Sequence, residues 1–307
     1  MPQTAPLPDA APRNWVDRRA PAPLRPWLKL GRFVRPAGIW LLMLPGWQGV
    51  ALAGALVGRG PDLRLLLEIF VGAALMRAAG CAYNDIVDRD FDAKVARTAG
   101  RPIPSGQIGV KQAWAFVAGC SLVSLVVLLT MGPLAIGLGI GSLALVAAYP
   151  FMKRITWWPQ AWLGLTFNWG ALLGYAAAAG KLSPATGLLY ASGVFWTLGY
   201  DTIYAIQDLE DDALAGVKSS ALRLGAQAPR AITAFYSLAL VLAFAAYLEA
   251  DLGFLFAPIF ALYGVHLMLQ ARRVQVDNPA RALALFKANG LAGLILFAAF
   301  AAGAVRI

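Results

Sequence analysis

The sequence predicts an all-α integral membrane protein with nine candidate membrane-spanning helices. Hydrophobic residues make up 59% of the 307 residues and charged residues only 14%, against roughly a quarter charged in an ordinary soluble protein. Apolar runs recur along the whole chain, and each is long enough to cross a hydrocarbon core about 30 Å thick as a helix. We expect the spans near residues 37–57, 63–86, 112–131, 133–149, 160–179, 184–207, 231–249, 252–270 and 283–304.

The first 36 residues differ from the rest, because they are rich in Pro, Ala and Arg and contain no apolar run. We expect a flexible cytosolic arm that leads into an interfacial segment around Trp27 to Phe33. Residues 37–307 would then form a single transmembrane domain. The late start of the first apolar run argues against a cleavable secretory signal. An Arg-rich start is also compatible with a mitochondrial transit peptide, although Asp9 and Asp17 argue against one.

Basic residues predict the orientation of the spans. With a cytosolic N-terminus, 21 of the 26 Lys and Arg residues fall in segments on the cytosolic side, as the positive-inside rule requires. The same distribution explains the net charge of +10 through contact with anionic lipid headgroups. Nucleic-acid binding is therefore not indicated. Two cysteines and one histidine also make a disulfide framework, a zinc site or a haem site improbable.

Two acidic clusters follow the second and sixth spans, and this topology places both on the cytosolic face. The first is Asn84-Asp85-Ile86-Val87-Asp88-Arg89-Asp90-Phe91-Asp92, and the second is Asp208-Leu209-Glu210-Asp211-Asp212. Each cluster contains two aspartates four residues apart, which share one face if the segment is helical. Repulsion within such a pair is relieved by a divalent cation, and hard oxygen ligands favour magnesium. Asn84 and Asp85 offer further oxygen ligands, whereas Asp90 is compatible with a simple water-facing position.

Cations that suit a phosphate group accompany these clusters. The loop after the first cluster carries Lys94, Arg97 and Arg101, and Lys153 follows Tyr149 at the end of the fourth span. Guanidinium groups match phosphate oxygens bidentately, although ordinary positive-inside anchoring is an alternative for each cation. Two ionisable residues lie deeper, Arg77 in the second span and Asp201 in the sixth. They form either a structural ion pair or a substrate pocket in which Arg77 binds a carboxylate and Asp201 polarises a hydroxyl.

At this point the residues resemble a known family, the UbiA-type intramembrane aromatic prenyltransferases. One signature is Asn84-Asp85-x-x-Asp88-x-x-x-Asp92 with Arg97-Thr98-x-x-Arg101-Pro102, and the other is Tyr200-Asp201-Thr202-x-Tyr204-Ala205-x-x-Asp208-x-x-Asp211-Asp212. The stretches Arg77-Ala78-Ala79-Gly80-Cys81 and Tyr149-Pro150-Phe151-Met152-Lys153-Arg154 resemble the branch that acts on 4-hydroxybenzoate. The resemblance runs from about Arg35 to the end of the chain.

The resemblance implies a nine-helix bundle around a central cavity, with cytosolic cap loops and a lateral opening for a polyprenyl chain. It implies two magnesium ions held by Asp88, Asp92, Asp208 and Asp212. Arg97, Arg101 and Lys153 would bind the diphosphate, with Tyr149 in the same element as Lys153. Arg77 and Asp201 would line the pocket for the aromatic substrate.

The implied activity is transfer of a polyprenyl group from an allylic polyprenyl diphosphate to the 3-position of 4-hydroxybenzoate, with release of diphosphate, in ubiquinone biosynthesis. The lipid bilayer is then the one partner besides the substrates, and no obligate protein partner is evident. The expected location is the bacterial inner membrane, with the mitochondrial inner membrane as the alternative. Two other functions stay open. One is the same chemistry on dihydroxynaphthoate, homogentisate, haem or chlorophyllide, and the other is secondary transport.

Overall fold

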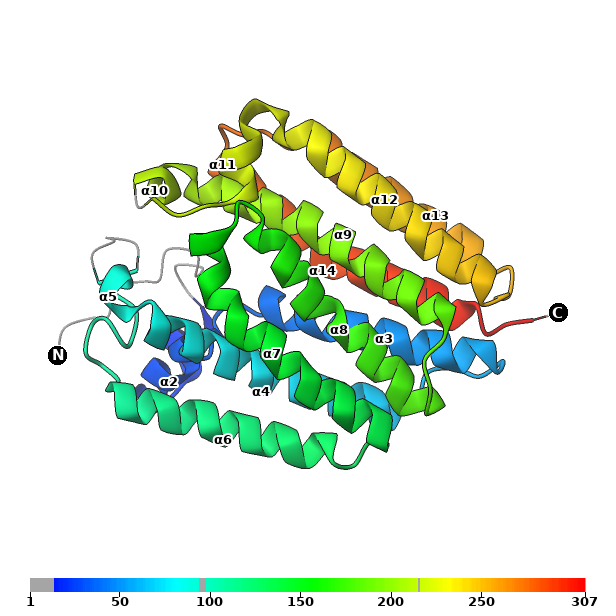
Figure 1. The fold of residues 1–307 in the computed structure, drawn as a ribbon, viewed down its shortest axis with the longest axis horizontal. Helices are drawn as coiled ribbons and strands as arrows, with labels where there is room; N and C mark the ends of the chain where they lie inside the picture. The colour runs from blue at the N-terminus through cyan, green and yellow to red at the C-terminus, as the bar shows by residue number, and fades with distance from the viewer. Residues whose placement is uncertain (1–13, 94–97, 215, 307) are drawn as a thin grey trace. The chain divides into compact units, whose positions relative to one another are not determined.

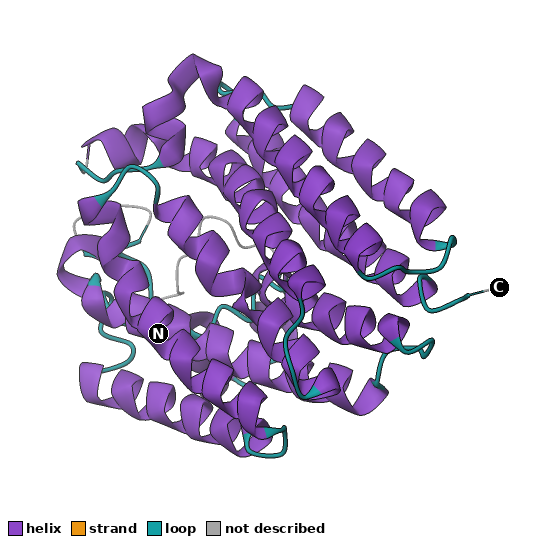
Figure 2. Ribbon diagram, turned by 45° about the vertical axis from the view of Figure 1, so that its right-hand side comes forward, coloured by secondary structure: helices purple, strands orange, loops and turns teal. Residues whose placement is uncertain are grey.

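The computed structural model describes residues 14–93, 98–214 and 216–306, and every regular element in these ranges is helical (Figures 1 and 2). Nine long helices make up most of the described chain, and each overlaps one predicted span. They are α3 (Ala37–Leu56), α4 (Leu63–Val87), α6 (Val110–Leu128), α7 (Pro133–Ile155), α8 (Pro159–Ala179), α9 (Pro184–Ala205), α12 (Ala228–Glu249), α13 (Phe256–Arg272) and α14 (Pro279–Ala302). The shorter helices are α1 (Trp15–Arg19), η1 (Ala22–Leu24), α2 (Arg25–Leu30), α5 (Arg89–Asp92), η2 (Ile206–Asp208), α10 (Leu209–Leu214), α11 (Ser220–Leu224) and η3 (Gly225–Gln227).

Within the described ranges, six helical segments are long and apolar enough to cross a membrane. They contain α3, α4, α6, α7, α12 and α14. The other three long helices are less apolar or shorter: α8 and α9 carry buried polar side chains such as Asn168 and Thr197, and α13 has 17 residues. The predicted class, an all-α multi-span membrane protein, is confirmed, while nine membrane crossings stay a prediction.

The helices belong to two compact units. The first contains the chain up to Trp40 together with Phe70–Thr130, and the second contains Leu41–Ile69 and Met131–Ile307. The first acidic cluster therefore lies in the first unit and the second acidic cluster in the second unit.

The N-terminal segment of the first unit contains the residues that were predicted to form a flexible cytosolic arm. From residue 14 onward the chain is folded, and it packs through Val16, Ala20, Leu30 and Val34, all of which are buried. Leu30 shares a cluster with side chains of α4 and α6, and the buried Lys29 forms an ion pair with the half-buried Asp17 at 2.8 Å. The sequence did not indicate this packing, because the apolar residues of 14–36 are too widely spaced to form a run. Val16, Ala20 and Val34 pack on one another and on Leu28, whereas Leu30 is covered by side chains of α4 and α6.

Several long helices of the second unit begin at a proline or after a side chain that caps their first turn. Proline occupies the first residue of four of them, where its fixed φ suits a helix and its missing N–H costs nothing; these prolines are Pro133, Pro159, Pro184 and Pro279. The side chains of Ser183 and Asn278 cap α9 and α14 by accepting a backbone N–H from the first turn, as N-caps do. Local chemistry thus explains why the predicted helix starts of this unit are close to the observed ones.

Small residues let α3 and α8 of the second unit approach closely. Gly46 and Gly49 of α3 lie directly against the backbone of Ala171 and Gly174 of α8, so that a methyl group on Gly49 or Gly174 would collide with a carbonyl oxygen of the facing helix. Helices in membranes associate mainly through such close packing, because lipid tails are as apolar as the side chains that they replace. The contact therefore contributes to holding this unit together.

Gly174→Ala should destabilise the protein by about 1–3 kcal/mol, the usual cost of overpacking a tight contact. The measurement is the thermal unfolding midpoint of the purified protein in detergent. Gly187→Ala in α9 is the matched control, because no atom lies within 4 Å of the position of its added methyl group. Equal midpoints for the two variants would show that the α3–α8 contact is not tight.

Buried polar side chains join α9 to its neighbours in the second unit. Asn289 of α14 accepts a hydrogen bond from the indole Nε1 of Trp196 at 2.8 Å and donates one to Gln270 of α13 at 2.9 Å. On another side of α9, the amide of Asn168 donates to the hydroxyl of Thr197 at 2.7 Å. Because a buried polar group without a partner is costly, these bonds select one rotation of α9 about its axis. That rotation sets where Asp201, further along the same helix, is directed.

Candidate active site

The first acidic cluster begins at the carboxyl end of α4. The backbone N–H of Asp88 donates to the carbonyl of Asn84 at 2.9 Å, and the N–H of Asp92 donates to the carbonyl of Asp88 at 2.8 Å. The helical path therefore continues through the motif into α5. Consequently Asn84, Asp88 and Asp92 follow one another on one helical face, as the spacing of four predicts. The side-chain amide of Asn84 donates to Asp88 at 3.2 Å.

Three carboxylates of this cluster are buried. Asp85 and Asp88 are each 1% exposed and Asp92 is 4% exposed, whereas the side chain of Asp90 is 87% exposed and pairs with its neighbour Arg89 at 3.3 Å. A carboxylate removed from water needs compensating charge or hydrogen bonds. The cluster thus contains three carboxylates that require partners and one that faces solvent.

Two arginines supply part of that compensation. Arg32 donates through Nη2 to both carboxylate oxygens of Asp85, at 2.7 and 2.8 Å. Arg101 donates through Nη1 to Asp92 at 2.6 Å and to Asp85 at 3.2 Å. The two guanidinium groups therefore pair with two of the buried carboxylates, Asp85 and Asp92.

Burial and the neighbouring charges shift the pKa values of Asp92 and Arg32. Burial raises the pKa of Asp92 above its usual value, and the neighbouring negative charges of Asp85 and Asp88 add to the rise, which Arg101 only partly offsets. Burial alone would lower the pKa of Arg32, but the charge of Asp85, its hydrogen bond with the guanidinium and the charges of Cys81 and Asp92 together outweigh burial and raise the pKa. Arg32 therefore stays charged, whereas the charged form of Asp92 is left under-stabilised, a deficit that additional positive charge would relieve.

Sequence reasoning missed Arg32. Its charge was counted among the basic residues that flank the first span, and no local pattern links it to Asp85, 53 residues away. Its backbone has a φ of 57°, a left-handed conformation that is uncommon for residues other than glycine and is found where the surrounding structure enforces it. The guanidinium also donates to the carbonyl of Lys29 at 3.1 Å. The N-terminal segment thus contributes a buried side chain to the first acidic cluster.

The loop after the first cluster is anchored in its described part. The hydroxyl of Thr98 donates to the backbone carbonyl of Asp92 at 2.7 Å, and Ile103 and Ile108 are buried in the same apolar cluster as Leu30. These contacts hold the segment that carries Arg101. Two other predicted phosphate-binding cations, Lys94 and Arg97, lie outside the described residues.

Arg77 lies on α4 in the first unit, as the sequence predicts, and is half-buried. Its guanidinium passes close to Gly38 of α3, where an added methyl group would lie 2.8 Å from Nε. A side chain larger than hydrogen at position 38 would therefore displace Arg77.

The predicted residues of the second unit lie on three of its elements. Asp201 is on α9, Asp208 ends η2 and Asp212 is on α10, and all three are half-buried. Tyr149 and Lys153, also half-buried, lie near the carboxyl end of α7. Two hydrogen bonds from Lys218 bind the loop after the second cluster to this end of α7. The backbone N–H of Lys218 donates to the carbonyl of Lys153 at 3.0 Å, and the ammonium group of Lys218 donates to the carbonyl of Ile155 at 3.1 Å.

A second pair of contacts fixes the end of the same loop. The backbone N–H of Ser220 donates to the side-chain oxygen of Gln160 on α8 at 3.0 Å, and the Ser220 hydroxyl lies 2.7 Å from that of Thr202 on α9. The loop is therefore tied to α7, α8 and α9 at once. These contacts bring the element that carries Lys153 next to the chain that follows Asp208 and Asp212, which the sequence alone does not show.

The acidic residues fit magnesium by their chemistry. Among the described residues, no three His, Cys, Asp or Glu side chains converge as a ready-made metal site. Magnesium does not need such a site, because it commonly uses one or two carboxylates together with substrate phosphates and water. Asp88 and Asp92 offer such a pair in the first unit. Asp85 is less suited, because both of its oxygens accept hydrogen bonds from Arg32.

Comparison with known proteins defines the class to which this fold and these motifs belong. The sequence matches the UbiA prenyltransferase family over residues 42–303. The match covers most of the chain, including both acidic clusters, and the chain therefore belongs to this family.

Among its relatives are mitochondrial 4-hydroxybenzoate polyprenyltransferases. The human protein of this name is 46% identical over 282 residues, which cover 91% of this chain and 75% of the relative. The protein of the same name from Arabidopsis thaliana is 41% identical over 291 residues, 94% of this chain and 71% of the relative. Relatives with this name thus occur in both animals and plants.

Solved structures share the fold. A UbiA homolog from Aeropyrum pernix K1, solved in its apo form, aligns with a TM-score of 0.71 and 28% identity, covering 85% of this chain and 96% of that one. A UbiA homolog from Archaeoglobus fulgidus, solved with GPP and Mg2+ bound, aligns with a TM-score of 0.65 and 17% identity, covering 90% of this chain and 98% of that one. The expected fold class is therefore confirmed.

Proposed function

We propose that this protein transfers a polyprenyl group from an allylic polyprenyl diphosphate to the 3-position of 4-hydroxybenzoate, with release of diphosphate, in ubiquinone biosynthesis. The observation that carries the proposal is the 46% identity, over 91% of the chain, to a protein named 4-hydroxybenzoate polyprenyltransferase. The buried carboxylates of the first acidic cluster and the cations beside them supply the chemistry that a diphosphate substrate requires.

Magnesium is the proposed metal, with Asp88 and Asp92 as ligands from the first cluster and Asp208 and Asp212 from the second. When bound, it would neutralise charge on the departing diphosphate. Asn84 contributes by holding the carboxylate of Asp88 through its amide. Asp85, predicted as a further ligand, is proposed instead to keep the two guanidinium groups of Arg32 and Arg101 in place.

The remaining residues bind and orient the two substrates. Arg101 and Lys153 bind phosphate oxygens, with the same role proposed for Lys94 and Arg97. As the bond from the allylic carbon to the diphosphate oxygen breaks, these cations stabilise the developing negative charge. The ring carbon ortho to the hydroxyl of 4-hydroxybenzoate attacks the allylic carbon, and loss of the ring proton restores aromaticity.

The acceptor is oriented from its two ends. Arg77 pairs with the carboxylate of 4-hydroxybenzoate through a guanidinium fork, and Asp201 polarises the phenol, which makes the ring more electron-rich. Tyr149 lies one helical turn before Lys153 and supports the phosphate-binding end of α7. The cytosolic loops and the apolar walls exclude water, which would otherwise capture the allylic cation.

The proposed location is an inner membrane with the acidic clusters on the cytosolic or matrix side. The relatives are named mitochondrial, which supports the mitochondrial inner membrane, and the bacterial inner membrane suits the same chemistry. The distribution of Lys and Arg supports this orientation in either case.

Prenyl transfer by the purified protein in detergent tests the proposal. We expect 3-geranyl-4-hydroxybenzoate from geranyl diphosphate and 4-hydroxybenzoate when magnesium is present, and no product when a chelator removes it, because unneutralised diphosphate is a poor leaving group. Mass spectrometry of the product shows the added geranyl group, and the ring-proton couplings in its NMR spectrum identify the ring position.

Parallel reactions with other acceptors separate the alternatives. Product from dihydroxynaphthoate or homogentisate but not from 4-hydroxybenzoate would contradict the assigned acceptor and keep the reaction type. A protein that forms no prenylated product with any acceptor, but moves a solute across proteoliposomes, would be a transporter instead.

A further inference from the structure

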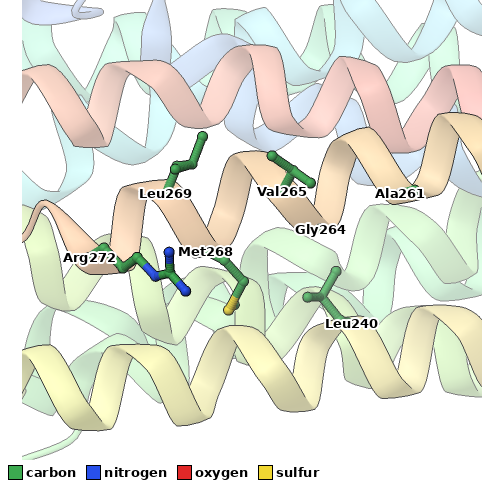
Figure 3. A pocket seen from close by; sticks show the side chains of 7 residues that line it. All are labelled: Leu240, Ala261, Gly264, Val265, Met268, Leu269 and Arg272. Atoms are coloured by element: carbon green, nitrogen blue, oxygen red, sulfur yellow. The ribbon is translucent and has the colours of Figure 1, made fainter.

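A groove lies between α12 and α13 on the surface of the second unit. It has a volume of about 430 Å³, within the range of about 300–1,000 Å³ that is common for ligand sites. Leu240 of α12 and Met268 of α13 project into the space between the two helices (Figure 3). Val265 and Leu269 of α13 also line the groove. Gly264 leaves the space between them open, because an added methyl group there would only touch the methyl groups of Leu240 at 3.7 Å.

The surroundings of the groove are apolar and exposed. On α13, Leu262 and Val265 are 61% and 58% exposed, and on α12 Val241 is 64% exposed. In a multi-span membrane protein such faces contact the hydrocarbon chains of lipids, because water would not be a favourable solvent for them. A hollow in such a face accepts an acyl chain.

One end of the groove carries a positive charge. Arg272 is the last residue of α13 and lines the groove. Its side chain points back along the helix toward Met268, rather than away from the end of the helix (Figure 3). Within the part of the chain that the structure describes, no carboxylate forms an ion pair with it. A guanidinium directed into an apolar groove at a membrane surface calls for an anionic group on the molecule that fills the groove.

We propose that this groove binds an anionic phospholipid, with one acyl chain between α12 and α13 and the phosphate on Arg272. A guanidinium group binds phosphate oxygens bidentately, and basic pockets between membrane helices commonly bind the headgroups of anionic lipids. A prenyl diphosphate also combines an apolar chain with phosphate. It fits less well, because the residues that line the groove include no carboxylate to hold the magnesium ion that accompanies a diphosphate.

Lipid binding to the purified full-length chain in detergent tests the site. The protein is titrated with dioleoylphosphatidylglycerol or dioleoylphosphatidylcholine, and bound lipid is counted by native mass spectrometry. We expect tighter binding of phosphatidylglycerol, and a loss of about fivefold in its affinity in Arg272→Ala, the effect of one basic residue near a lipid headgroup. Arg272→Gln should give the same loss if the alanine variant is poorly folded.

Two further variants separate the groove from its surroundings. Arg273→Ala removes the same charge from the neighbouring residue, which does not line the groove, and it should leave the affinity unchanged. Gly264→Leu fills the hollow and should weaken binding of both lipids. Equal losses in Arg272→Ala and Arg273→Ala would overturn the proposal in favour of general attraction to anionic lipid. Displacement of phosphatidylglycerol by geranyl diphosphate from the wild-type protein but not from Arg272→Ala would also overturn it, because the groove would then be a substrate site.

Discussion

Asp88→Ala and Asp208→Ala should each lower turnover at least about a hundredfold, the scale of loss when one group that stabilises developing charge is removed. Asp88 is 1% exposed and lies on the helical face shared with Asn84 and Asp92. Its removal deletes a carboxylate that the proposed function assigns to magnesium. Asp208 has the corresponding place in the second cluster. The measurement is the initial rate of prenyl transfer at saturating substrates across a series of magnesium concentrations.

Asp90→Ala is the matched control for the first cluster. Asp90 lies two residues from Asp88, but its side chain is 87% exposed and pairs with the adjacent Arg89. This variant removes the same charge from the same segment and should keep nearly full activity. An Asp88→Ala protein with near wild-type turnover would contradict the metal assignment. If Asp90→Ala lost as much turnover as Asp88→Ala, the loss would instead come from the changed net charge of the segment.

Arg32→Met should destabilise the protein by about 3–5 kcal/mol, the usual cost of removing one partner from a buried ion pair. The substitution keeps an unbranched side chain of similar length, so that the main change is the loss of charge beside Asp85. Arg101, which already lies 3.2 Å from Asp85, would then compensate more of the charge of Asp85. We therefore also expect a higher KM for the prenyl diphosphate, because Arg101 becomes less available to phosphate.

Removing the other partner tests this explanation. The double variant Arg32→Met with Asp85→Asn removes both charges of the ion pair, so that no buried carboxylate is left without its guanidinium partner. We therefore expect much of the lost stability to return. The measurements are the thermal unfolding midpoint in detergent and the KM for geranyl diphosphate. Arg18→Met changes an exposed arginine of the same N-terminal segment and should have little effect. A double variant no more stable than Arg32→Met alone would show that Arg32 acts through something other than the charge of Asp85.

The sequence was sufficient to predict the helices and most of the acidic clusters. Apolar runs, helix-starting prolines and aspartates four residues apart are local patterns, and their meaning depends only on the geometry of a single helix. For this reason each predicted span overlaps a long helix, and Asn84, Asp88 and Asp92 share a face in the structure. Family resemblance, carried by the same local motifs, identified the class of protein.

Contacts between distant segments were decided by the tertiary structure alone. The partner of Asp85 is Arg32, from a segment that the sequence predicted to be flexible, and the partner of Trp196 is Asn289, 93 residues away. Neither pairing has a periodic signature, because it depends on which helices pack together and at what rotation. The groove that ends at Arg272 arises in the same way, from the packing of α12 against α13. Local chemistry thus determined the helices and their acidic motifs, whereas packing determined which buried charges became partners.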